Sequence, residues 1–210
     1  SSFGFGPTGI VIGNVNKQNP KNSGAFSFAF MQTANFNNVI HYKGLNNYSS
    51  YSEQFAEEFS KSGLSIDQVL NTNSPLPYTS ALALQTYLID TVSFGGTTVV
   101  RGAPEKILDA GQALEQEKLM TSKGGLYEIA LGGAFNKGDE WFFGGTLGIP
   151  IVSYSSTTTF TESDTSNNTL NGYKNSTYTD NFSTSGAGVN LKLGVIYRPK
   201  ESIRLGLAVH

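Results

Sequence analysis

The side chains that usually carry catalysis or metal binding are sparse and scattered in this sequence. Its two histidines, His41 and His210, lie far apart, and no cysteine is present to supply a thiolate. Glu115 and Glu117 would share one face of a strand and could bind a cation, while a solvated rim is the ordinary role of such a pair. None of the many serines stands in the strand–turn–helix context of a hydrolase nucleophile. These residues predict no enzyme, no metal site and no cofactor.

The charge of the chain excludes one class of partner. The formal net charge is -2, and charged residues make up 14% of the sequence, against about 25% in an average domain. No basic stripe is present, so nucleic acid is not expected as a partner. No apolar run approaches the roughly 18 residues of a membrane helix, but a membrane-spanning strand needs only about 9–11 residues.

The second half of the chain alternates large apolar residues with small or polar ones. The alternation covers Leu126–Phe135, Trp141–Ile151, Ala187–Tyr197 and Ile203–Val209. A period of two is typical of a strand with two different faces. Short polar turns follow the first and third of these segments, and Pro150 predicts a bulge or a register change because it cannot donate a ladder hydrogen bond.

The first half fits the same scheme. One strand is expected over Thr8–Val15, and a second carries Phe26, Phe28 and Phe30 on one face. A long insertion over about 43–112 follows, with helices predicted over Tyr51–Lys61 and Tyr78–Ile89. A second long polar loop is expected over about 155–177.

Loop lengths therefore alternate between short and long along the chain, with about six strands in all. This alternation is typical of an up-and-down barrel, with tight turns on one side of the membrane and long loops outside. The sequence predicts an all-β, antiparallel transmembrane barrel over 1–210, partial in strand number, with a helical extracellular insertion.

The two faces of the strands differ in a way that favours a membrane. Lys192 and Arg204 fall on the face of small residues, whereas on a lipid face each would cost roughly 2–4 kcal/mol at mid-membrane. Aromatic residues gather near the short turns, as in interfacial girdles: Phe135, Trp141, Phe143 and Tyr197. We expect four leucines of the opposite face to point to lipid: Leu131, Leu147, Leu193 and Leu205.

A soluble secreted β-sandwich, acting as an adhesin or a glycan-binding module, stays open as the alternative. The inner faces of a sandwich show the same alternation of large and small residues. Folding without detergent would separate the two architectures.

Three segments read TSKGGLYE over Thr121–Glu128, GGTLGIP over Gly144–Pro150 and IYRPKESIRLGL over Ile196–Leu207. They resemble the FadL/TodX family of outer-membrane transporters of Gram-negative bacteria. Tyr87–Asp90 is similar to the branch of that family often labelled hemin receptor. The resemblance implies transport of hydrophobic small molecules, such as long-chain fatty acids or aromatic hydrocarbons, across the cell outer membrane.

The resemblance also implies fourteen strands and an N-terminal hatch. The chain is then expected to be a fragment, with the hatch before Ser1 and further strands after His210. The full-length protein would be a monomeric barrel in contact with outer-membrane lipid.

An apolar set inside the polar insertion is the candidate ligand site: Phe55, Phe59, Leu64, Leu82 and Leu84. In the family that the chain resembles, helical extracellular loops form a hydrophobic groove that captures ligand first. The alternative is that the two helices pack on each other and cap the barrel, since short helices need tertiary packing to form.

Overall fold

A computed structural model describes residues 6–71 and 77–210, most of which lie in β-strands. The elements in chain order are β1 (Thr8–Val15), β2 (Ser23–Asn35), β3 (Asn38–Asn46), α1 (Ser52–Ser62), α2 (Ile66–Leu70), α3 (Tyr78–Gln85), β4 (Ile89–Phe94), β5 (Thr97–Gly102), α4 (Glu105–Asp109), β6 (Leu114–Lys137), β7 (Trp141–Asp164), β8 (Asn175–Ala187), β9 (Asn190–Lys200) and β10 (Ile203–Val209). No helix in this part of the chain is long and apolar enough to cross a membrane.

The chain divides into two compact units. Unit 1 comprises residues 6–39, 121–157 and 181–210, and unit 2 comprises residues 40–120 and 158–180. Strands β3, β6, β7 and β8 contribute residues to both.

The strands of the main sheet pair in the order β1-β2-β6-β7-β9-β10. Strand β3 also pairs with β6, and β8 also pairs with β7. These two strands bring the sheet to eight strands. Every register known for these pairs is antiparallel, which confirms the all-β, antiparallel class expected from the sequence. Within the described residues the sheet does not close, and β1 and β10 stand at the two ends of this order.

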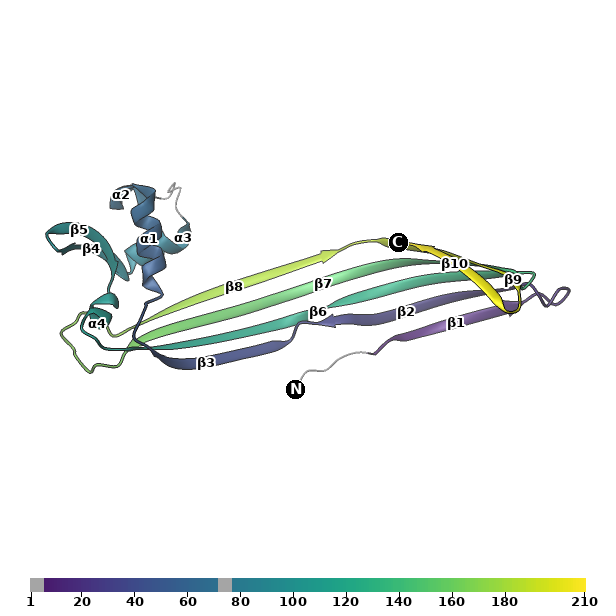
Figure 1. The fold of residues 1–210 in the computed structure, drawn as a ribbon, viewed down its shortest axis with the longest axis horizontal. Helices are drawn as coiled ribbons and strands as arrows, with labels where there is room; N and C mark the ends of the chain where they lie inside the picture. The colour runs from purple at the N-terminus through teal and green to yellow at the C-terminus, as the bar shows by residue number, and fades with distance from the viewer. Residues whose placement is uncertain (1–5, 72–76) are drawn as a thin grey trace. The chain divides into compact units, whose positions relative to one another are not determined.

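The strand register in unit 1 confirms the alternation of faces read from the sequence, because directly paired residues share a face. Thr146 pairs with Lys192, and Leu147 pairs with Leu191, on the neighbouring strands β7 and β9 (Figure 1). The small-residue face carries Ser27, Gly132, Thr146 and Lys192, among others, and the large-residue face carries Phe28, Leu131, Leu147, Leu193 and Leu205.

Aromatic side chains cluster on the large-residue face near the short turn between β6 and β7. The Trp141 ring stacks on Tyr197 with ring centroids 4.3 Å apart, and on Phe143 at 6.0 Å. Trp141 is the first residue after the Gly138–Glu140 turn, so the clustering of these aromatics beside a short turn, predicted from the sequence, is confirmed.

Pro150 stands where the partner of β7 is interrupted. Strand β9 pairs with Trp141–Gly148, and β8, the other partner of β7, ends at Ala187. The Pro150 carbonyl accepts a hydrogen bond from the Gly188 amide at 2.9 Å. Proline has no N–H to donate to a partner strand at this position. The bulge or register change that the sequence predicts at Pro150 stays a prediction.

Strand structure reaches into the range 155–177 that the sequence assigned to a loop. Strand β7 continues to Asp164 and β8 begins at Asn175, which leaves only residues 165–174 between them. The segment is rich in threonine, whose branched side chain favours a pleated backbone although it is polar. The sequence did not predict this part of the strand because its residues are polar and no apolar alternation marks it.

Unit 2 has a compact apolar core around α1 and α3. Its buried members are Phe55, Ala56, Phe59, Val69, Ala83, Leu84 and Ile89. Helix α1 agrees with the predicted helix Tyr51–Lys61 to within one residue and ends at Gly63, whose φ of 65° is left-handed. Helix α3 ends at Gln85, and the chain turns there into the β4–β5 hairpin instead of continuing to Ile89.

Gly124 offers a test of the close packing between β6 and β7. Its φ is 123°, and a Cβ atom there would lie 2.0 Å from the Ser153 carbonyl oxygen. We expect Gly124→Ala to cost about 1–3 kcal/mol of folding free energy, because the clash involves backbone. Gly133→Ala, in the same strand, should be nearly neutral, since no atom lies within 4 Å of its Cβ position. Urea titration of both variants measures the difference, and equal midpoints would contradict this packing.

Candidate functional site

The small-residue face of unit 1 holds a groove of about 790 Å³. Val11, on the edge strand β1, and Ala208, on the edge strand β10, both line it. Residues from both edges can line one hollow only if the sheet curls toward this face. Glycine, alanine and other small residues supply much of the lining, which keeps the groove open.

A polar cluster lies on the same face. Lys192 Nζ is 3.7 Å from Glu128 Oε1, and the side-chain amide of Asn190 donates a hydrogen bond to the same oxygen at 3.4 Å. A Cβ atom at Gly148 would come within 2.3 Å of both Glu128 and Asn190, so glycine leaves the room that these side chains occupy. The carboxylate thus balances the lysine charge that the sequence placed on this face.

Unit 2 holds a second, smaller cavity of about 390 Å³, which we call the tyrosine pocket. Its walls come from α1, α3 and the residues after it, β7, and the start of β8 with the loop before it. The lining residues are Tyr51, Phe55, Thr79, Leu82, Ala83, Thr86, Tyr87, Leu88, Ala103, Phe160, Glu162, Gly172, Tyr173, Lys174, Asn175, Ser176, Thr177 and Tyr178.

One wall of the tyrosine pocket is a packed group of rings centred on Tyr51. Its ring centroid lies 4.7 Å from that of Phe160, 5.3 Å from Phe55 and 5.6 Å from Tyr178. Burial raises the pKa of Tyr178 above its usual value. The wall therefore combines apolar ring faces with a hydroxyl that can donate a hydrogen bond.

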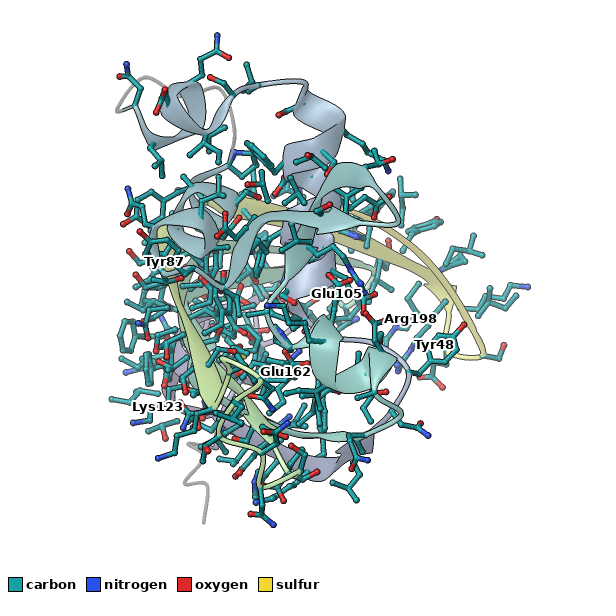
Figure 2. The ribbon with its side chains drawn as sticks, turned by 90° about the vertical axis from the view of Figure 1, so that its left-hand side faces the viewer. Tyr48, Tyr87, Glu105, Lys123, Glu162 and Arg198 are labelled. Carbon is teal, nitrogen blue, oxygen red and sulfur yellow. The ribbon has the colours of Figure 1, made fainter. Side chains whose placement is uncertain are left out.

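Glu162, labelled in Figure 2, is a carboxylate buried at the pocket, with 1% of its surface exposed. It accepts hydrogen bonds from the Ser50 hydroxyl at 2.8 Å, the Tyr51 amide at 3.0 Å and the Gln116 side chain at 2.7 Å. These donors come from the start of α1 and from β6, so one side chain of β7 anchors the helix to the strands of unit 2. Such bonds offset the cost of burying a carboxylate.

Tyr87, also labelled in Figure 2, lines the pocket in an unusual backbone conformation. Its φ is 55°, and its side chain is 76% exposed. The Tyr87 amide donates to Leu84 O at 3.1 Å and the Leu88 amide donates to Ala83 O at 2.9 Å, which is the Schellman arrangement at the end of α3. Glycine usually occupies this left-handed position. A tyrosine there has a higher backbone conformational energy than a glycine would have.

The five residues predicted as a ligand site lie in two different places. Phe55, Phe59 and Leu84 are buried in the core of unit 2, and Leu64 packs against that core. Leu82 is partly exposed and lines the tyrosine pocket together with Phe55. Of the five, these two alone line the tyrosine pocket.

Sequence reasoning missed most of the pocket. The sequence places Tyr51 in a helix and Tyr87 in a resemblance motif, but neither in a site. Glu162 lies in the polar range 155–177, and Tyr178 directly follows that range. The sequence predicts a loop there. The concentration of tyrosine between 48 and 87 and between 154 and 178 was the available signal.

Glu115 and Glu117, considered from the sequence as a cation site, face basic side chains of β3. Glu115 pairs with Lys43 at 2.8 Å, and Glu117 pairs with His41 Nε2 at 2.8 Å. The hydrogen bond from His41 and the charge of Lys43 hold the pKa of Glu117 below its usual value. The carboxylates are thus partnered by side chains of the chain itself.

Comparison of the chain with protein-family models, with curated proteins and with solved structures finds no match in any of the three.

The anchor role of Glu162 can be tested by removing its carboxylate. We expect Glu162→Ala to cost on the order of 3 kcal/mol, because each buried donor left unsatisfied costs about 1–3 kcal/mol. The loss should appear as faster hydrogen exchange of the α1 amides. Glu57→Ala, which removes an exposed carboxylate of α1 paired with Lys61, should leave that exchange almost unchanged. Similar exchange in the two variants would count against the anchor.

Proposed function

We propose that unit 1 forms part of the wall of an outer-membrane β-barrel of a Gram-negative bacterium, and that this barrel carries hydrophobic small molecules. One observation carries the proposal: unit 1 has almost no core of its own. Of the ten apolar residues buried among the described residues, nine lie in unit 2, and Ala130 alone lies in unit 1. Its large apolar side chains remain exposed instead, with Leu147 at 39%, Leu193 at 49% and Leu205 at 60%.

Exposure on this scale favours a hydrocarbon environment. Burying a leucine away from water stabilises by about 1.5–3 kcal/mol, and soluble monomers rarely expose contiguous apolar patches beyond a few hundred Å². Lipid tails would cover the large-residue face without any further protein. The sheet curls away from that face, which is the direction a barrel wall requires.

The cargo would move along the small-residue face. The groove there is lined by small and apolar residues, and Lys192 is balanced by Glu128. A ligand rich in carbon gains about 0.8 kcal/mol for each CH₂ removed from water, so no covalent step or cofactor is needed. The resemblance to the FadL/TodX family supports long-chain fatty acids or aromatic hydrocarbons as the cargo.

A soluble secreted β-sandwich would place its apolar face against a second sheet. In the described residues the only other sheet is the two-stranded β4–β5 hairpin, which belongs to unit 2. A chain that stays folded and monomeric without detergent would therefore favour the sandwich and contradict the barrel.

The membrane proposal predicts opposite environments for neighbouring residues of one strand. The chain has no cysteine, so single cysteines can be introduced and spin-labelled cleanly. In lipid vesicles, labels at Leu131, Leu147, Leu193 and Leu205 should be accessible to dissolved oxygen and protected from a water-soluble nickel complex. Labels at Gly132, Thr146 and Lys192 should lack that lipid signature. A nickel-accessible label at Leu147 beside a lipid-exposed one at Thr146 would mean that the faces are inverted.

The transport proposal predicts that filling the groove reduces uptake. Gly144 lines the groove, and no side chain lies within 4 Å of its Cβ position. We expect Gly144→Phe to lower uptake of labelled palmitate by cells that carry the full-length protein, whereas Leu147→Phe, on the opposite face, should not. Heat-modifiable gel mobility verifies that both variants assemble. Equal uptake by two assembled variants would contradict a route along this face.

A further inference from the structure

We propose that the tyrosine pocket of unit 2 binds a carbohydrate, one or two sugar rings of a glycan. The inference concerns unit 2 alone and does not rest on the transport proposal. It is carried by the conformation of Tyr87 and by the chemistry of the pocket lining.

The backbone of Tyr87 indicates that its ring has a role at the pocket. A left-handed φ of 55° is unusual for a bulky residue, and glycine would end α3 with less strain. The ring is not used in the core, because it is 76% exposed. Residues held in such conformations gather at binding sites, where a particular side chain must be presented. Here the strain presents a tyrosine ring at the pocket.

The polar groups of the lining argue against a plain hydrocarbon as the ligand. Lys174 and Asn175 line the pocket together with the ring wall. A hydrocarbon would bury these groups without hydrogen-bond partners, which is unfavourable. A strongly anionic ligand would meet the buried Glu162 carboxylate.

A sugar ring matches both kinds of lining. Its C–H face can stack on the exposed faces of tyrosine, and its hydroxyl groups donate and accept hydrogen bonds around the edge. The exposed residues Lys174 and Asn175 of the lining carry polar side chains that can bond to those hydroxyl groups.

The size of the pocket agrees with this class of ligand. Its volume of about 390 Å³ lies at the lower end of the roughly 300–1,000 Å³ usual for small-molecule sites. This room suits one or two sugar rings and excludes a long polysaccharide bound along its whole length.

The experiment uses the full chain refolded in detergent micelles. Saturation-transfer NMR with the methyl glycosides of glucose, galactose, mannose and N-acetylglucosamine should show transfer to at least one of them, and titration gives its affinity. Tyr87→Phe keeps the ring and should retain binding. Tyr87→Gly should weaken binding roughly two- to tenfold, the range expected for one ring contact, while raising the urea midpoint because the strain is relieved.

The matched control is Tyr48→Gly, which removes another tyrosine of unit 2, 91% exposed and outside the pocket lining. It should leave glycoside affinity unchanged. The proposal is overturned if no glycoside binds the folded chain, or if Tyr87→Gly binds as tightly as the parent. It is also overturned if palmitate or toluene displaces a bound glycoside from a Tyr87-dependent site. None of these results bears on the lipid exposure of Leu147, which decides the barrel proposal separately.

Discussion

The architecture of unit 1 depends on the register of its strand pairs. In a strand, one step along the chain moves a side chain to the opposite face, so a slip of one residue would exchange the two faces completely. In the observed register Thr146 meets Lys192 and Leu147 meets Leu191. A slip that turned β9 over would put Lys192 among leucines, and a slip that turned β7 over would move Leu147 into the groove. The charged pair of Lys192 and Glu128 and the stacked Trp141 and Tyr197 are compatible only with the observed register, so they select it.

Unit 2 is held together by different forces. Its apolar core around Phe55 and Phe59 resembles that of any small soluble domain, and Glu162 adds a polar anchor at the start of α1. The anchor is directional, because a carboxylate bonded to a backbone amide fixes the position of the helix more narrowly than apolar contact does. The tyrosine pocket lies between elements that this anchor connects, which explains how an open cavity persists beside a packed core.

The sequence predicted the elements whose side chains alternate strongly, and β1, the β6–β7 turn and β10 lie where it placed them. It missed the strand beyond residue 155 because threonine, although it favours strands, carries no apolar signal. The β4–β5 hairpin had a readable signal in Gly95-Gly96, both with positive φ, between two alternating segments. No local pattern distinguishes a buried Phe59 from an exposed one, since both give the same helical spacing. The left-handed conformation of Tyr87 is likewise invisible in the sequence, because glycine, not tyrosine, is the usual residue at this position.

The open edges of unit 1 sharpen the membrane proposal. In water, the unpaired backbone groups of β1 and β10 are solvated, while the exposed large-residue face is costly. In hydrocarbon the balance is reversed. The large-residue face is then in a favourable environment, and each unpaired backbone group costs several kcal/mol. A sheet with this composition is therefore stable in a membrane only if both edges are paired with further strands, whether from the same barrel or from another chain. Under the membrane proposal, lipid covers the apolar side chains and strand pairing satisfies the backbone at both edges, and a complete barrel is the arrangement that provides both.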